Sequence, residues 1–161
     1  MQLLQPCLED INRTIRKSIP PVYFFLSLLL MLALAYFMPL SHLIYIPLRV
    51  FGGMLILLGL ALTVWGAYCF GQAATPVKIF EKTTVLVTFG PYQYSRNPMY
   101  LGMIIILTGT WIALGTLSPL FVIPVFFYII QEGFIKYEEN ILEESFTAEY
   151  QDYRKKVRRW V

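Results

Sequence analysis

Residues 97–131 decide the fold, and they read NPMYLGMIIILTGTWIALGTLSPLFVIPVFFYIIQ. These 35 residues contain no charged side chain. As one helix they would be about 52 Å long, whereas the hydrocarbon core of a bilayer is about 30 Å thick. The segment GTLSP at 115–119 lies near the middle and contains residues that stop and restart helices. The stretch therefore predicts a tight hairpin of two short membrane helices.

Two more neutral stretches, 18–48 and 50–77, precede this hairpin, and each is long enough to cross a bilayer. The first has the apolar core of a secretory signal peptide, with a cleavage-like ALA at 33–35. However, its polar leader is long and the apolar run continues past Ala35, which favours an uncleaved helix. The second predicts a helix from about Leu48 to Phe70 that ends at Gly71.

The composition agrees with a membrane protein. Hydrophobic residues make up 57% of the chain, charged residues only 14%, and the mean hydropathy is +0.60. These values exclude a disordered chain, a disulfide scaffold and a nucleic-acid-binding domain. We expect an all-α, polytopic integral membrane protein with about four transmembrane helices. Its single domain, 1–161, would comprise a helix pair (1–70), a connection (71–98), a hairpin (99–135) and an interfacial amphipathic helix (136–161).

The basic residues predict the orientation. Three precede the first helix, three lie in the 71–98 connection and six follow the last helix, whereas Arg49 alone falls on the opposite side. Such asymmetry predicts that both termini and the connection lie on the cytoplasmic side of the membrane, which we expect to be the cell (inner) membrane. Cys7 and Cys69 would then face the reducing side, so we expect packing roles and no disulfide. His42 has no Cys, Asp or Glu nearby, and no metal site is expected.

Glycines recur every seven residues at Gly52, Gly59 and Gly66, and again at Gly102 and Gly109. Small residues on one face let membrane helices approach closely, so helix packing is the preferred interpretation. A flat wall for a bound cofactor is the alternative.

The C-terminal segment is amphipathic. Apolar residues recur from Ile141 to Trp160 at spacings of three and four, and the last eight residues include Arg154, Arg158 and Arg159. This pattern predicts a helix beginning at the membrane surface, with its basic end against anionic headgroups.

Two polar features suggest a site. Arg96 directly precedes the Asn97-Pro98 start of one hairpin helix, and Glu138-Glu139 follow the other arm. Because the hairpin is tight, Arg96, Tyr100 and Glu138 are expected to be neighbours at the lipid boundary. Successive helical residues point about 100° apart, so one glutamate can face inward while the other faces water. Anchoring of the helix ends is the alternative interpretation.

These residues also carry a family resemblance. The run LVTFGPYQYSRNPMYLG, followed by YEENILEESFTAEYQDYRKKVRRW, resembles the isoprenylcysteine carboxyl methyltransferase and phospholipid methyltransferase superfamily. The family pattern is a G-P-Y turn, R-H-P-x-Y, a helical hairpin, E-E-x-x-L and F-x-x-x-Y-x-x-Y, and it covers about residues 74–161. The resemblance implies methyl transfer from S-adenosyl-L-methionine to a lipophilic small molecule or lipid that enters from the membrane.

The resemblance also implies site residues and two departures. Cofactor contacts would fall on Thr84, Val85, Leu86, Val87, Tyr92, Asn97, Pro98, Met99, Tyr100 and Glu138. Asn97 replaces the family's usual histidine and cannot titrate. Phe134 stands where the isoprenylcysteine enzymes have an arginine for the substrate carboxylate, which argues against a prenylated cysteine as acceptor.

The chemistry assigns catalytic roles to Arg96, Glu138 and Glu139. Glu138 can balance the cofactor's positive charge and Arg96 can hold an anion. Glu139 can orient Arg96 or deprotonate an amine acceptor, although a position facing solvent is the simplest expectation. Two rival functions stay open: an NADPH-dependent membrane reductase of the related sterol-reductase type, and a non-catalytic membrane subunit.

Overall fold

A computed structural model describes residues 19–40, 46–73 and 85–161, which are helical apart from short loops and contain no strand. The predictions that concern Cys7, His42 and Thr84 lie outside these residues. The elements are α2 (Pro20–Phe37), α3 (Ile46–Gln72), η1 (Gly90–Gln93), α4 (Pro98–Leu114), η2 (Ser118–Phe121), α5 (Val122–Ile130), η3 (Gln131–Ile135) and α6 (Lys136–Lys156). The short elements η1 and η2 are 3-10 helices, and η3 is a π-helix.

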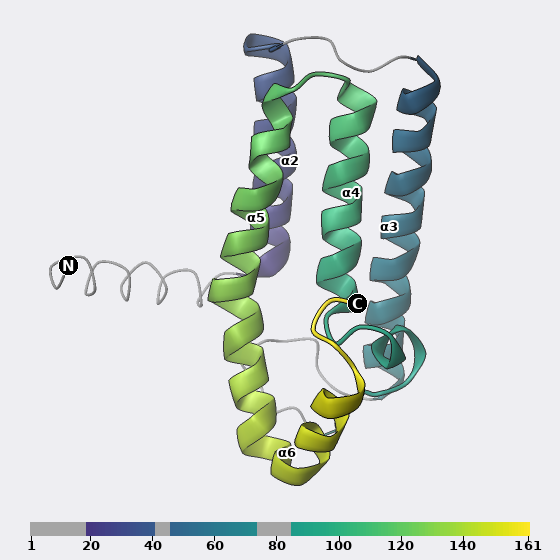
Figure 1. Cartoon of the computed structure of the whole chain (residues 1–161), viewed down its shortest axis with the longest axis vertical. Coiled ribbons are helices and arrows are strands. Elements are labelled where there is room, and N and C mark those ends of the chain that lie inside the picture. Colours follow the sequence, from purple (N-terminus) through teal and green to yellow (C-terminus); the bar gives the residue numbers. More distant parts are fainter. Residues whose placement is uncertain (1–18, 41–45, 74–84) are drawn as a thin grey trace, which may run out of the picture.

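Helices α2, α3, α4 and α5 stand side by side as an elongated bundle (Figure 1). In the described part of the chain, three helical stretches are long and apolar enough to cross a membrane: Pro20–Phe37, Leu48–Gln72 and Ser118–Lys156. α4 is apolar but shorter, at 17 residues, which is about the minimum for a crossing. Large apolar side chains such as Leu29 and Leu57 are exposed on the outside, where lipid would cover them. The predicted all-α membrane fold is confirmed.

The hairpin forms where the sequence predicted it. α4 ends at Leu114, and Gly115 adopts a left-handed conformation with φ of 74°, which glycine reaches without steric cost. Ser118 then starts η2 and donates a 3.2 Å hydrogen bond to the carbonyl of Leu34, while the amide of Leu117 donates to the carbonyl of Leu40 at 2.9 Å. These bonds fix the end of the hairpin to α2.

The repeated glycines mark the contact between α3 and α4. A Cβ on Gly59 would lie 2.6 Å from the carbonyl oxygen of Gly102, and one on Gly109 would lie 2.6 Å from that of Gly52. The backbones of the two helices therefore touch, as the packing interpretation predicted. Because the facing helix occupies the space beside these glycines, they do not form a wall for a cofactor.

The second arm of the hairpin runs directly into the C-terminal helix. α5 continues through η3 into α6 without a break, so that Ser118–Lys156 forms one helical stretch of 39 residues. α6 begins at Lys136, the predicted start of the C-terminal helix, and Gly133 lies within the π-helix before it. α3 ends at Gln72, one residue beyond the predicted stop at Gly71 and within the usual variation of a helix end.

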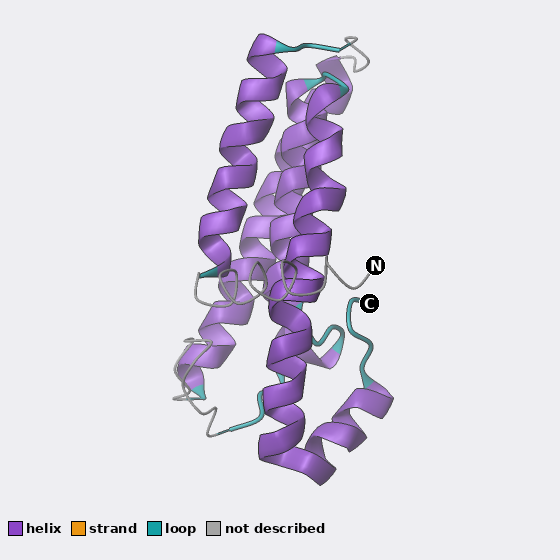
Figure 2. Cartoon of the chain, turned by 90° about the vertical axis from the view of Figure 1, so that its left-hand side faces the viewer, coloured by secondary structure: helices purple, strands orange, loops and turns teal. Residues whose placement is uncertain are grey.

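α6 does not run in one direction. Phe146 has non-helical dihedral angles (φ −128°, ψ 28°), and the helix bends there. Beyond the bend, the chain turns back toward the bundle and brings the C-terminus to the start of α4 (Figures 1 and 2). The bend brings the end of α6 against the residues that precede α4, and the candidate site lies there.

Candidate functional site

The site is built where the 85–97 connection, the first turn of α4 and α6 meet. Pro98 occupies the first turn of α4, where its missing N–H leaves no intrahelical bond unmade. Glu138 and Glu139 lie in the first turn of α6. The tight hairpin and the length of the α5–η3–α6 stretch bring these two turns together.

Tyr100 and Glu138 are in direct contact. The Tyr100 hydroxyl donates a hydrogen bond of 2.6 Å to Oε1 of Glu138. Tyr100 is buried and Glu138 is half-buried. A short hydrogen bond to a carboxylate is among the stronger polar contacts in proteins, so it orients Glu138 firmly.

Arg96, which was expected next to this pair, contacts the other glutamate. Its Nη1 lies 2.9 Å from Oε1 of Glu139 and donates to the Tyr150 hydroxyl at 3.0 Å. The side chain of Arg96 is only 9% exposed. The expectation that Glu139 faces solvent is wrong, because that residue is 8% exposed and carries the ion pair.

Arg159 is the second cation on Glu139. Its Nε donates to Oε1 of Glu139 at 3.0 Å and its Nη2 donates to Oε2, so the guanidinium grips both carboxylate oxygens. The hydrogen bonds to Glu139 raise the pKa of Arg159 further. A carboxylate buried between two guanidiniums is well compensated, which explains why Glu139 can leave solvent.

The chain after α6 forms a strap across the connection. The amide of Arg96 donates to the carbonyl of Arg158 at 3.0 Å, and Ser95 Oγ and Asn97 Nδ2 donate to the carbonyl of Arg159 at 3.3 and 3.1 Å. The Trp160 indole stacks on Phe127, with ring centroids 4.9 Å apart. This segment, residues 157–161, is called the C-terminal strap below.

The expected contact of all the last basic residues with headgroups is therefore wrong for Arg159, which points into the protein. Arg158 is exposed, and Arg154 forms an exposed ion pair with Glu143. Lys155 and Lys156 are exposed as well, so the other four basic residues of this segment point outward.

Tyr92 in η1 supplies a buried hydroxyl. It is 5% exposed, and among the described residues its hydroxyl has no hydrogen-bond partner. Burial, followed by the charge of Glu138, raises the pKa of Tyr92 well above its usual value, so the phenol stays protonated at neutral pH. Its backbone carbonyl accepts a 2.6 Å hydrogen bond from Tyr153.

The remaining predicted cofactor residues line the same connection. Val87 is buried with Cys69 and Tyr92, whereas Val85 is 46% exposed. Met99 is half-buried and packs against Gly66, where a Cβ would lie 2.8 Å from Met99 Cγ. Cys69 is a free, buried cysteine.

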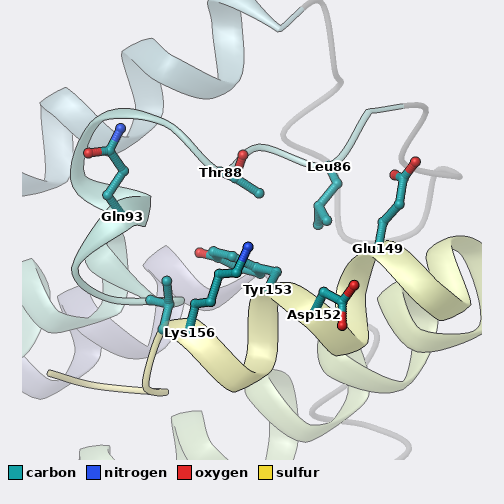
Figure 3. Close-up of a pocket in the computed structure, with 8 residues that line it drawn as sticks. Leu86, Thr88, Gln93, Glu149, Asp152, Tyr153 and Lys156 are labelled. Carbon is teal, nitrogen blue, oxygen red and sulfur yellow. The ribbon is translucent and has the colours of Figure 1, made fainter.

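A solvent-open pocket of about 590 Å³ separates the connection from α6 (Figure 3). It is lined by Leu86, Thr88, Gln93, Glu149, Asp152, Tyr153, Lys156 and Val157. A neighbouring pocket of about 540 Å³ shares Leu86 and Glu149 and adds Val85 and Phe146. Of the predicted cofactor residues, Val85 and Leu86 line these pockets, and Tyr100 and Glu138 do not.

Comparison with known proteins identifies the family of the chain. The family model described as phospholipid methyltransferase matches residues 48–149, from the start of α3 into α6. The chain belongs to the phospholipid methyltransferase family. The matched residues include Arg96, Tyr100, Glu138 and Glu139, whereas the C-terminal strap lies beyond them.

Three relatives of this phospholipid methyltransferase family member are informative. Protein-S-isoprenylcysteine O-methyltransferase from Saccharomyces cerevisiae is 34% identical over 117 aligned residues, covering 67% of this chain and 46% of the yeast protein. The enzyme of the same name from Schizosaccharomyces pombe is 36% identical over 77 residues, covering 48% of this chain and 33% of its own length. An uncharacterized Haemophilus influenzae protein is 36% identical over 63 residues, its full length. The chain thus spans less than half of the two named enzymes, and no solved structure matches it significantly.

Sequence reasoning missed three residues of this family member's site: Tyr150, Tyr153 and Arg159. Two of them belong to the F-x-x-x-Y-x-x-Y pattern, which places tyrosines three residues apart and hence on one helix face. That face contacts the connection and not the membrane surface. The spacing was a usable signal for the tyrosines, whereas nothing in the sequence distinguishes Arg159 from Arg158.

Proposed function

We propose that this chain transfers a methyl group from S-adenosyl-L-methionine to a lipophilic acceptor, at the membrane face where α6 and the connection meet. The observation that carries the proposal is the Tyr100–Glu138 hydrogen bond, together with the ion pair between Arg96 and the next residue of α6, Glu139. A carboxylate, a guanidinium and aromatic rings come together at the end of an apolar bundle. These groups suit a cofactor with a cationic sulfonium and amino group and an anionic carboxylate.

The residues present fit that cofactor. Glu138 offers a carboxylate to a cationic group, and the rings of Tyr92 and Tyr100 offer aromatic faces, which attract cations. The Tyr92 hydroxyl and Arg96 Nε are buried and lack partners among the described residues, so both can bind a ligand. We assign Thr84, Val85, Leu86, Val87, Tyr92, Asn97, Pro98, Met99, Tyr100 and Glu138 to cofactor binding, with Arg96, Glu138 and Glu139 as the charged groups of the reaction.

Methyl transfer from a sulfonium is an in-line displacement that needs no covalent nucleophile on the protein. The protein has to align donor and acceptor, and alignment can contribute about 7–11 kcal/mol to lowering the barrier. Tyr100 orients Glu138, and Glu139 and Tyr150 hold Arg96. Such a pre-ordered polar site at the end of an apolar bundle suits a displacement in which the positive charge leaves the sulfonium, and with an anionic acceptor that charge is neutralised.

The acceptor is proposed to be lipophilic because the polar groups lie at the end of apolar helices long enough to cross a membrane. The two named relatives are isoprenylcysteine O-methyltransferases. In this chain, Phe134 stands where that class would need an arginine for the substrate carboxylate, and it is 1% exposed. We therefore favour a lipid amine, thiol or small hydrophobic amine over a prenylated cysteine.

The positive residues favour a cytoplasmic site in the inner cell membrane. Twelve of the 13 lysines and arginines fall on the side of the termini and the connection, and Arg49 falls on the other. A cytoplasmic site would have access to S-adenosyl-L-methionine.

Binding of radiolabelled S-adenosyl-L-methionine to detergent-purified protein tests the proposal. We expect saturable binding that S-adenosylhomocysteine displaces, and transfer of label to an organic-extractable product in membranes. Saturable NADPH binding in its place would indicate the reductase alternative. Absence of binding for both ligands would support the non-catalytic alternative and refute the proposed function.

A further inference from the structure

Arg96 and Arg159 share one carboxylate unequally. Arg159 donates from Nε and Nη2 to the two oxygens of Glu139, whereas Arg96 contacts Glu139 through Nη1 alone. Arg96 Nε is buried and has no partner in the part of the chain that the structure describes. The two carboxylate oxygens of Glu139, called its fork below, are therefore both bound by Arg159.

This arrangement has a chemical consequence for Arg96. Guanidinium and carboxylate groups favour a two-pronged geometry in which two parallel N–H groups meet two oxygens. Without Arg159, Glu139 would be free to take Arg96 in that geometry and to use its Nε. With Arg159 in place, Arg96 keeps an N–H for another anion.

Backbone contacts hold Arg159 next to Glu139, where it can displace Arg96 from the two carboxylate oxygens. Ser95 and Asn97 both donate to its backbone carbonyl, and the amide of Arg96 donates to the carbonyl of Arg158. Trp160 follows directly and stacks on Phe127. The backbone of the C-terminal strap is thus tied to the residues on both sides of Arg96.

We propose that Arg159 is a positioning residue: it occupies the fork of Glu139 and so leaves Arg96 Nε available for the carboxylate of the bound cofactor. This inference rests on the proposed function, because it needs the cofactor to bind beside Arg96. It also gives the C-terminal strap a role that the membrane-anchor interpretation does not. An anchor would depend on basic charge at the surface, and Arg158 supplies that charge equally well.

The test compares two ligands that differ by one carboxylate, S-adenosylmethionine and decarboxylated S-adenosylmethionine, by calorimetry with the full-length protein in detergent. We expect Arg159→Gln to weaken S-adenosylmethionine binding at least about tenfold, as for loss of one charge-assisted hydrogen bond. The affinity for the decarboxylated ligand should change less than about twofold, because it lacks the group that Arg96 would hold. That retained affinity also shows that the variant is folded.

Arg158→Gln is the matched control, since it removes the same charge one residue away from an exposed side chain and keeps the backbone carbonyl. It should leave both affinities unchanged. Arg159→Lys keeps the charge but cannot reproduce the two-pronged contact, so it should remain weaker than wild type for S-adenosylmethionine only. This variant carries the test if Arg159→Gln does not fold.

The outcomes separate the two proposals. Wild-type affinity in Arg159→Gln, full restoration by lysine, or equal losses for both ligands would overturn the positioning role while the proposed function stands. Equal effects of Arg158→Gln and Arg159→Gln would show a surface-charge effect and overturn it as well. If the wild-type protein binds neither ligand, the proposed function fails, and this inference fails with it.

Discussion

Tyr100 donates a 2.6 Å hydrogen bond to Glu138, which lies 38 positions farther along the chain. One residue is in the first turn of α4 and the other in the first turn of α6. The contact depends on the hairpin at Gly115, which sends the chain back to the same end of the bundle. It places a carboxylate at the point where the apolar helices end.

Replacement of Glu138 by alanine should strongly weaken cofactor binding while the fold is retained. The variant loses a charged partner worth about 1.5–3 kcal/mol, which corresponds to an affinity loss of about 10–150-fold. Equilibrium binding of S-adenosylmethionine would measure the affinity, and the elution volume in size-exclusion chromatography in detergent would show whether the fold is retained. Glu144→Ala, at an exposed position of the same helix, is the control and should bind normally. Wild-type affinity in Glu138→Ala would argue strongly against a cofactor site at Glu138.

Tyr100→Phe should reduce stability and cofactor affinity together. The substitution keeps the buried ring but leaves the Glu138 carboxylate without its hydroxyl donor, at a cost of about 1–3 kcal/mol. The free energy of unfolding in denaturant would report the change. Tyr94→Phe is a matched control because Tyr94 is 71% exposed, and it should be neutral. If both variants unfold like wild type, the hydrogen bond contributes little to the fold.

The helical hairpin could be predicted from the sequence because its cause is local. A neutral stretch longer than a bilayer is thick has to turn back, and GTLSP at 115–119 contains the residues for the turn. The proximity of Tyr100 and Glu138 followed from that turn. The close approach of α3 and α4 was likewise visible in the spacing of the glycines, because no other residue allows backbones to touch.

The C-terminal strap could not be predicted, because an amphipathic pattern does not say what covers its apolar face. A membrane surface and the protein's own connection favour the same alternation of residues. Phe146 has no helix-breaking chemistry, yet the bend there returns Tyr150 and Arg159 to the connection. Glu139 was expected to face solvent because most glutamates do, with a contact to Arg96 as the alternative, and its second partner Arg159 could not be told apart from Arg158 in the sequence.

Gly102→Ala should separate α3 from α4. A Cβ at Gly102 would lie 2.6 Å from the carbonyl oxygen of Gly59 and closer still to Thr63 Oγ1. Backbone cannot yield as a flexible side chain does, so overpacking should cost about 1–3 kcal/mol and lower the unfolding temperature in detergent. Gly53→Ala is the matched control, because a Cβ there meets nothing within 4 Å. Equal unfolding temperatures for the two variants would contradict the close helix contact.

Phe134→Arg should destabilise the protein and should not create a site for a prenylated cysteine. Phe134 is 1% exposed, packs edge-on against Tyr23 with ring centroids 5.6 Å apart, and lies in the core between α2, α4 and α5. An arginine there would bury a charge without a partner, at a cost of about 3–5 kcal/mol. Phe134→Leu, which keeps an apolar side chain, should fold and retain S-adenosylmethionine binding. Unfolding temperature and methylation of an S-farnesylated cysteine would be measured for both. A folded Phe134→Arg variant that gains this methylation would show that the apolar residue at 134 alone excludes the carboxylate substrate.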